Sequence, residues 1–205
     1  DVGYRTRKMP FWLGKLGKEK WHISEQFDLL AAPLGLCTDL SSDEKDRLYG
    51  KAWEHFLINT KCVLGVESGA SIIDFDGKLE RQVDAYVDKN PNASFEEVHS
   101  KFLSSFEGNL RLNQISPRCF EAAALRTVMI LFAGDYSGIL ESDRHYISLN
   151  KDFSNFDDVV SRIRDDDYLQ KMADTTYKEI ACNPKYSYEH FISKIDGILI
   201  REFKN

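Results

Sequence analysis

The sequence predicts a three-layer α/β domain, in which helices cover both faces of a parallel β-sheet. Short apolar runs typical of buried strands alternate along the chain with longer segments that repeat apolar residues at helical spacing. This alternation indicates parallel strands joined by crossover helices. The chain has 205 residues and contains no internal repeat, low-complexity segment or linker, so we expect residues 1–205 to form a single domain.

Five segments carry the strand pattern, and they are residues 2–7, 36–40, 61–66, 128–132 and 145–149. The run at 128–132 is apolar throughout and partly β-branched, which is typical of a buried strand. Each of these segments is bounded by residues that favour turns or helix starts. The spacing leaves room for a helix in most of the intervals between them.

Helices are predicted over 14–32, 41–59, 117–125, 155–164, 167–181 and 188–203. Pro33 and Gly35 end the first of these, and Ser41 or Ser42 caps the second. Two more helices, over 78–89 and 94–106, are separated by an Asn-Pro-Asn break. We expect them to form a helical insertion between the third and fourth strands, and residues 167–203 to form closing helices.

Composition limits the classes of function. The net charge of -6 argues against a broad nucleic-acid surface, which needs a basic stripe. No apolar run is long enough to span a membrane, and no signal-peptide pattern opens the chain. The widely spaced Cys37, Cys62, Cys119 and Cys182 favour free thiols in a reducing compartment, so we expect a cytoplasmic protein. Because the chain opens at Asp1 within a predicted strand, we also expect it to be part of a longer protein.

The most informative motif is the segment 116–125, Ser-Pro-Arg-Cys-Phe-Glu-Ala-Ala-Ala-Leu. Ser116 suits the N-cap of a helix and Pro117 suits its first position. Helix N-termini bind anions through unpaired N–H groups and the helix dipole. Arg118 beside this terminus suits a diphosphate, and Glu121 one turn later suits the two hydroxyls of a ribose. The alternative is a structural helix in which Glu121 pairs with Arg118 or Arg126.

This motif resembles the nucleotide-sugar-binding segment of GT-B glycosyltransferases, especially the spore-maturation-protein-like branch of family 1. The tail supports the likeness with His-Tyr-Ile-Ser-Leu at 145–149 and Asn-Phe-Asp-Asp-Val at 155–159. The resemblance covers about residues 61–203, and more weakly the opening segment 2–20. It implies a Rossmann-like domain, one half of a GT-B fold, that binds a nucleoside diphosphate sugar as donor substrate without a metal or other cofactor.

The resemblance also implies a partner. GT-B enzymes place acceptor recognition, and usually the catalytic base, in an N-terminal domain, and we expect these 205 residues to have room for only one of the two domains. The catalytic residues are therefore unknown, and we expect the fragment to be inactive without that domain. One departure concerns Asn113, because many relatives carry a second glutamate eight positions before the one at Glu121. The branch named above tolerates this departure, but Asn113 weakens the case for a two-glutamate donor clamp.

The candidate nucleotide-sugar-binding residues are Glu121, Arg118, Ser116, Arg5, Arg7, Lys20, Lys18, Glu67, Ser68, Gly69, Tyr136 and Ser137. The basic members near the N-terminus would offset the charge on a departing diphosphate, and otherwise they form a solvated edge. The segments 67–71 and 136–138 follow strands at their carboxyl ends, where ligands bind in open α/β sheets. Otherwise both segments are ordinary turns.

Two acidic patterns look like metal sites. Asp74 and Asp76 form an Asp-x-Asp pattern, and Asp165, Asp166 and Asp167 are consecutive. We expect a solvated turn and an interhelical break at these positions, and no metal. Two other functions remain open on this fold: a non-catalytic module that binds a nucleotide or a protein, and part of a GT-B-fold sugar-nucleotide epimerase.

Overall fold

The computed structural model describes residues 1–203 and contains a five-stranded parallel sheet. Its strands are β1 (Val2–Arg5), β2 (Thr38–Ser41), β3 (Cys62–Gly65), β4 (Val128–Phe132) and β5 (Ile147–Leu149). They are ordered β2-β1-β3-β4-β5, and every neighbouring pair is parallel. The predicted α/β class and parallel sheet are thus confirmed.

The strands form the centre of the core. All of β4 is buried, and the first three residues of both β1 and β3 are buried. Parallel strands that are covered on both faces are apolar without alternation, which explains the continuous apolar runs in the sequence. In the register of the sheet, Val2 of β1 lies opposite Thr38 of β2 and Cys62 of β3.

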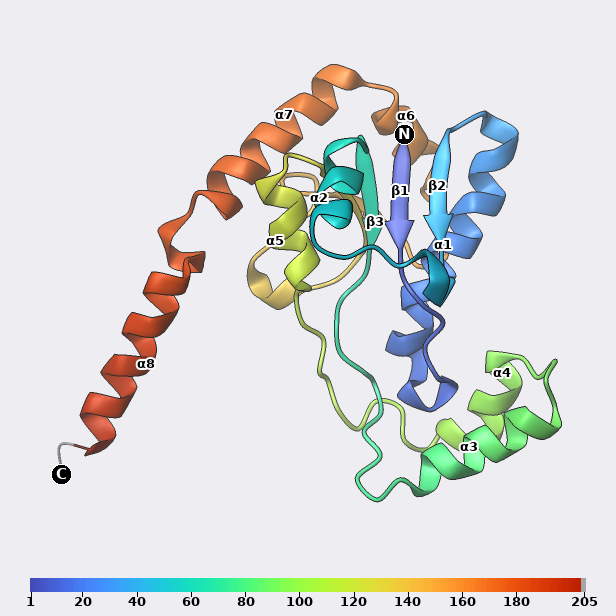
Figure 1. Cartoon of the computed structure of the whole chain (residues 1–205). Helices are drawn as coiled ribbons and strands as arrows, with labels where there is room; N and C mark the ends of the chain where they lie inside the picture. The colour runs from blue at the N-terminus through green and yellow to red at the C-terminus, as the bar shows by residue number, and fades with distance from the viewer. Residues whose placement is uncertain (204–205) are drawn as a thin grey trace.

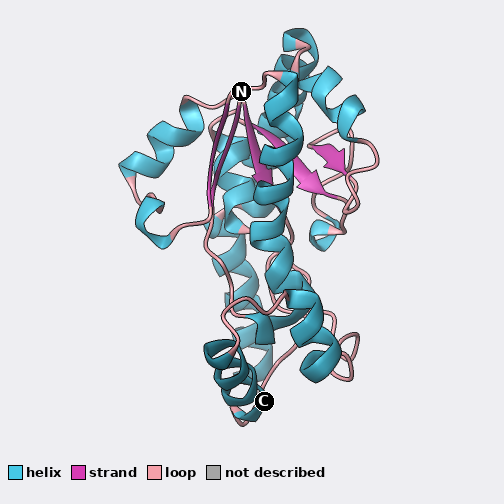
Figure 2. Cartoon of the chain, turned by 90° about the vertical axis from the view of Figure 1, so that its right-hand side faces the viewer, coloured by secondary structure: helices cyan, strands magenta, loops and turns pink. Residues whose placement is uncertain are grey.

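Helices form the two outer layers (Figures 1 and 2). On one face lie α1 (Gly14–Ala31) and α6 (Phe156–Ile163), where the rings of Phe27 and Phe156 meet edge to face with centroids 5.0 Å apart. On the other face lie α2 (Lys51–Ile58) and α5 (Pro117–Ala124). The helix α7 (Asp166–Thr176) begins near the amino end of β3, since Lys61 and Asp166 form a 2.8 Å ion pair.

A helical insertion follows β3, as predicted. It consists of α3 (Lys78–Lys89), α4 (Phe95–Val98) and a π-helical turn at His99–Leu103. These segments bury a small separate core that includes Ile72, Leu79, Val83, Phe95, Val98 and Leu103. The insertion is fastened to the loop after β1, where Phe11 packs edge to face on Phe95.

The predicted helix over 41–59 is wrong in its first half. Ser41 belongs to β2, and its hydroxyl accepts a hydrogen bond from the N–H of Asp43 and donates one to Asp46. Only a 3₁₀ turn, Glu44–Asp46, follows before the chain passes Gly50 at φ 53° and enters α2. A residue with positive φ, such as Gly50, interrupts a right-handed helix, so the helix starts at Lys51.

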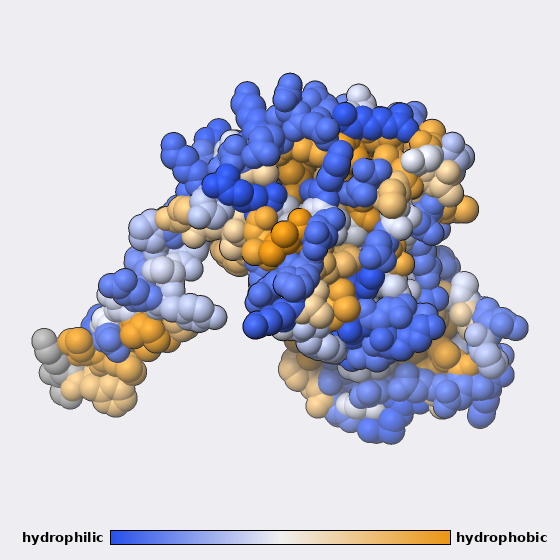
Figure 3. Space-filling view, turned by 45° about the horizontal axis from the view of Figure 1, so that its top comes forward, coloured by the Kyte–Doolittle hydropathy of each residue, from blue (hydrophilic) through white to orange (hydrophobic). Residues whose placement is uncertain are grey.

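The last helix, α8 (Tyr188–Phe203), extends away from the body of the domain (Figure 1). Its exposed apolar side chains include Tyr188, Phe191, Ile192, Ile195, Ile198, Leu199, Ile200 and Phe203. Figure 3 shows hydrophobic surface along this projecting arm. Within residues 1–203 no helix combines the length and the apolar character that crossing a bilayer requires.

Short turns complete the secondary structure. They are the 3₁₀ segments Phe11–Leu13, Ala32–Leu34, Tyr136–Gly138 and Pro184–Tyr186 and a second π-helical segment, Tyr177–Ala181. The turn at Tyr136–Gly138 stands where a crossover helix between β4 and β5 would otherwise be.

Candidate functional site

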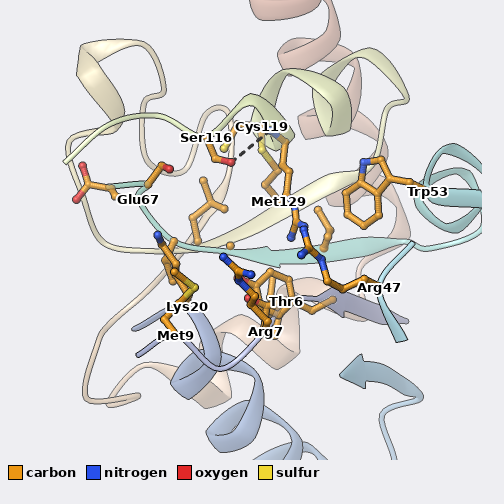
Figure 4. Close-up of a pocket in the computed structure, with 18 residues that line it drawn as sticks. Thr6, Arg7, Met9, Lys20, Arg47, Trp53, Glu67, Ser116, Cys119 and Met129 are labelled. Carbon is orange, nitrogen blue, oxygen red and sulfur yellow. Dashed lines mark hydrogen bonds between the residues drawn. The ribbon is translucent and has the colours of Figure 1, made fainter. Parts of the chain in front are cut away.

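A cavity of about 210 Å³ opens at the carboxyl ends of β1 and β3 (Figure 4). The chain leaves β1 toward β2 on one side and later returns to β3 on the other side, so the order of the strands reverses between β1 and β3. Open α/β sheets bind ligands in the crevice at such a reversal. Thr6 and Arg7 reach the cavity directly after β1, and Val66, Glu67 and Ser68 reach it after β3.

The cavity is lined with positive charge. Arg7, Lys20, Arg47 and Arg118 all contribute to its wall. Among the described residues of the wall, Glu67 is the only acidic one, and its carboxylate is engaged elsewhere. In Figure 4 the side chains of Arg7 and Arg47 lie between Lys20 at one end and Trp53 at the other. This arrangement favours an anionic ligand.

Lys20 extends from α1 into the cavity, where its Nζ donates a 2.9 Å hydrogen bond to the carbonyl of Gly69. Burial lowers the pKa of Lys20, and the charge of Arg7 lowers it further. Within residues 1–203 no carboxylate lies at ion-pair distance from Lys20. A bound anion would supply the missing negative charge.

Arg118 is fixed at the N-terminus of α5. Ser116 caps this helix, as predicted, and its Oγ accepts a 3.4 Å hydrogen bond from the N–H of Arg118. The guanidinium group donates to the carbonyl of Arg5 and lies 5.0 Å from the ring centroid of Trp53. Arg118 is therefore held in place before any ligand arrives.

Glu121 lies at the edge of the site and is exposed. It does not line the cavity, but its Oε2 accepts a 2.7 Å hydrogen bond from Nε1 of Trp53, which does. The ion pair considered as an alternative is not formed with Arg126, because Arg126 pairs with Asp174. Arg118 forms no ion pair with Glu121 either; its guanidinium donates to the carbonyl of Arg5 and lies over the ring of Trp53.

Glu67 has a structural role within the fold. Its buried carboxylate accepts hydrogen bonds from the backbone N–H groups of Asp135 and Tyr136, at 3.2 and 3.1 Å, and from the side chain of Asn113, at 2.6 Å. Gly134 leaves the space for it, since a Cβ there would stand 2.8 Å from the Glu67 carboxyl carbon. Figure 4 shows this carboxylate directed away from the cations. Glu67 thus holds the turn after β4 against the loop after β3.

Arg5 and Lys18 lie outside the cavity. Arg5 forms a 2.7 Å ion pair with Asp39 of β2 and stacks on Phe56, 4.5 Å from the ring centroid. Lys18 pairs with Glu96 of the insertion and lies over Phe95. Their partners come from segments distant in sequence, and these partners turn both charges away from the predicted site.

Tyr136 and Ser137 also lie outside the cavity. The hydroxyl of Tyr136 is buried and donates a 2.7 Å hydrogen bond to the carbonyl of Phe132. Ser137 accepts a 3.1 Å hydrogen bond from the N–H of Ile115. Both side chains therefore stabilise the turn that Glu67 holds.

The loop after β3 keeps its two smaller candidates near the cavity. Ser68 lines it, and the carbonyl of Gly69 accepts the hydrogen bond from Lys20. Gly69 has φ 111°, and a Cβ there would stand 2.1 Å from the carbonyl oxygen of Leu112. Only glycine fits this close approach.

Sequence reasoning missed several wall residues: Thr6, Met9, Arg47 and Trp53. Arg47 lies in the first half of the segment 41–59, which is not helical, and Trp53 lies in α2. One signal was available for Trp53, because a tryptophan usually finds a partner for its N–H. No pattern in the sequence indicated the other three.

As predicted, Asp74 and Asp76 lie in a turn, and Asp165 lies in the break between α6 and α7. Asp74 accepts a hydrogen bond from the N–H of Glu80, and Asp76 pairs with Lys78 at 2.6 Å. Asp165 caps α7 by accepting from the N–H of Tyr168. Across residues 1–203, no three His, Cys, Asp or Glu side chains come together in a way that could hold a metal ion.

Cys119 lines the cavity but is not an activated nucleophile. Burial raises the pKa of its thiol to about 12, so the thiol stays protonated at neutral pH.

Comparison of the sequence with profiles of known protein families gives no match, and neither does comparison with curated proteins.

Proposed function

We propose that this domain binds a nucleoside diphosphate sugar and serves as the donor-binding half of a GT-B-type glycosyltransferase. The observation that carries the proposal is the convergence of Arg7, Lys20 and Arg118 in one cavity at the β1/β3 reversal. A cavity of this charge needs an anion, and the crevice at a strand-order reversal is where nucleotides bind in open α/β sheets.

The diphosphate would occupy the cationic part of the cavity. Arg118 offers a planar fork of donors, which suits phosphate oxygens, and the N-terminus of α5 adds its dipole. Lys20 and Arg7 approach from the β1–α1 side. Fixed cations at this place would also stabilise the charge that builds on the diphosphate as the sugar departs. The proposal therefore assigns this charge stabilisation to side chains and includes no metal ion.

Glu121 would accept the two hydroxyls of the ribose. A carboxylate has about four lone-pair sites for hydrogen bonds. Trp53 occupies one of them, so acceptor capacity remains for a diol. Because Glu121 lies one helical turn beyond Arg118, the ribose and the diphosphate would lie along the same face of α5.

The transferase would require a second domain to supply the acceptor site and the catalytic base. This part of the proposal rests on the resemblance to GT-B enzymes and on fold analogy. The exposed apolar side chains of α8 would suit contact with such a domain, and so would those of Ile73, Phe75, Phe106 and Leu110, which flank the insertion.

Calorimetric titration of the domain with UDP, GDP, ADP, CDP and dTDP tests the proposal. We expect weak binding of at least one, because the domain supplies one wall of an interdomain cleft. Titration with inorganic pyrophosphate measures the contribution of the diphosphate without a nucleoside. Failure of all five nucleotides to bind at millimolar concentration would contradict the proposal.

A further inference from the structure

Two aromatic rings of α2 stack on each other, and a guanidinium group lies over each of them. Trp53 and Phe56 stack with their ring centroids 5.6 Å apart and an interplanar angle of 22°. Arg118 lies over Trp53 at 5.0 Å, and Arg5 lies over Phe56 at 4.5 Å. The two arginines are also joined directly, because Arg118 donates a hydrogen bond to the carbonyl of Arg5. This stack ties α2 to β1 and to the N-terminus of α5.

Trp53 makes a second contact at its edge. Its Nε1 donates the 2.7 Å hydrogen bond to Oε2 of Glu121. The same indole therefore contacts the guanidinium of Arg118 with its face and the carboxylate of Glu121 with its N–H. Phe56 and Arg118 both pack on the ring of Trp53.

We propose that Trp53 is a positioning residue that sets Glu121 relative to Arg118, and that it thereby makes the site selective for ribonucleotides. This inference rests on the proposed function. A glutamate side chain on the helix surface samples several rotamers, and fixing it costs conformational entropy when a ligand binds. A tryptophan has only two side-chain torsions, so holding its N–H in one place costs little conformational entropy. The hydrogen bond from this N–H therefore fixes the carboxylate of Glu121 before the ribose binds.

The contacts assign different roles to the parts of the indole. The N–H positions Glu121, which would bind the ribose diol. The ring positions Arg118, which would bind the diphosphate. Replacement of Trp53 by phenylalanine removes the N–H and keeps an aromatic face for Arg118. Such a variant should lose selectivity for the diol and keep affinity for diphosphate, a separation that a purely structural role for Trp53 would not produce.

The test uses titrations of the wild-type domain, Trp53→Phe, Glu121→Ala and the double variant. The ligands are ADP, GDP and UDP, their 2′,3′-dideoxy counterparts, and inorganic pyrophosphate. Trp21→Phe is the matched control, because Trp21 lies outside the cavity wall. Thermal unfolding of each variant reports any loss of stability.

We expect the wild type and Trp21→Phe to prefer the ribonucleotide by about tenfold or more, the difference of one or two hydrogen bonds to a charged group. Trp53→Phe should reduce this preference to about threefold or less while pyrophosphate affinity stays within about twofold. In the Glu121→Ala background the substitution should change nothing further, because coupled residues are not additive.

Four results would overturn the inference. In the first, Trp53→Phe keeps the wild-type preference. In the second, it weakens ribonucleotide, dideoxynucleotide and pyrophosphate equally, which indicates a structural role. In the third, Glu121→Ala keeps the preference that Trp53→Phe loses, which indicates that Trp53 contacts the ribose itself. In the fourth, the wild type binds none of the nucleotides, and the proposed function then fails together with this inference.

Discussion

The side-chain amide of Asn113 donates a 2.6 Å hydrogen bond to the carboxylate of Glu67, a residue 46 positions earlier in the chain. In this fold a carboxylate at position 113 would face the buried carboxylate of Glu67, and two like charges at this separation destabilise each other. The asparagine therefore has a structural explanation in this chain, as the donor that completes the hydrogen bonds of Glu67.

Asn113→Asp should destabilise the domain. The change replaces a donor with a second carboxylate beside Glu67, and we expect a loss of about 1–3 kcal/mol in the free energy of unfolding at neutral pH. Urea unfolding monitored by circular dichroism measures this loss.

Asn109→Asp is the control for that variant, because Asn109 is exposed and its amide donates to the carbonyl of Ser105 rather than to a carboxylate. It should leave the unfolding midpoint close to that of the wild type. Equal stability of the two variants would show that Asn113 does not support Glu67.

Lys20→Met should weaken anion binding while changing stability little. Because burial and Arg7 lower the pKa of Lys20, its charged form is disfavoured in the folded state, and removing the charge offsets the lost hydrogen bond to Gly69. Pyrophosphate affinity should fall by about tenfold or more, since a charge-assisted contact is lost.

Lys8→Met is the matched control for Lys20→Met. Lys8 is exposed and paired with Glu25, and it does not line the cavity at the carboxyl ends of β1 and β3. The two variants are compared by calorimetry and thermal unfolding. An unchanged pyrophosphate affinity in Lys20→Met would show that Lys20 does not bind the anion.

Glu179→Gln should make the domain less stable in a manner that depends on pH. Hydrogen bonds from Arg144, at 2.7 and 2.8 Å, and from His145, at 2.9 Å, lower the pKa of Glu179 to about 2. A carboxylate whose pKa is depressed by folding contributes stability above its ordinary pKa and loses it as the pH falls toward the depressed value.

The difference in the free energy of unfolding between Glu179→Gln and the wild type should therefore be largest at pH 7, and it should decrease from about pH 5 toward pH 2. Urea unfolding at several pH values measures it. Glu141→Gln provides the comparison, because Glu141 is exposed and lies 3.7 Å from the same arginine. A difference that does not vary with pH would contradict the role assigned to Glu179.

The layered fold was predictable because its determinants are local. The continuous apolar run of β4 and the Ser116-Pro117 start of α5 each specify their own element, and both are present as predicted. The failure at 41–59 has a local cause too, since Gly50 adopts φ 53° and breaks the helix that the apolar spacing suggested. The contact of β2 with β1, which includes Ser41 in the sheet, is not visible from that segment alone.

The site was predictable only where a residue is placed by its own element. Arg118 and Ser116 line the cavity because they begin α5, and Arg7 lines it because it follows β1. Arg5 does not, because Asp39, which is 34 residues away, binds its guanidinium. Trp53, in contrast, lines the cavity although it was not predicted to, and its partner Glu121 lies 68 residues away in the sequence.

The domain should not transfer sugar by itself. Among the residues that line the cavity, the one carboxylate belongs to Glu67, and three hydrogen bonds occupy it, so the described part of the wall offers no free acidic group to act as a base. Incubation with UDP-, GDP- and ADP-sugars and a panel of glycan acceptors, followed by mass spectrometry, measures transfer. Sustained turnover by these 205 residues would show that no second domain is needed.

The most direct test of the central claim is one calorimetric series that titrates the tightest-binding nucleoside diphosphate into the wild type, Glu121→Ala and Asp74→Ala. Loss of charge-assisted hydrogen bonds to a ribose should lower the affinity of Glu121→Ala by about one to three powers of ten. Its unfolding midpoint should change little, because Glu121 is exposed. Asp74→Ala should bind as the wild type does, with or without Mg²⁺. If Glu121→Ala instead binds normally and Asp74→Ala loses a metal-dependent affinity, the donor site proposed beside α5 is contradicted.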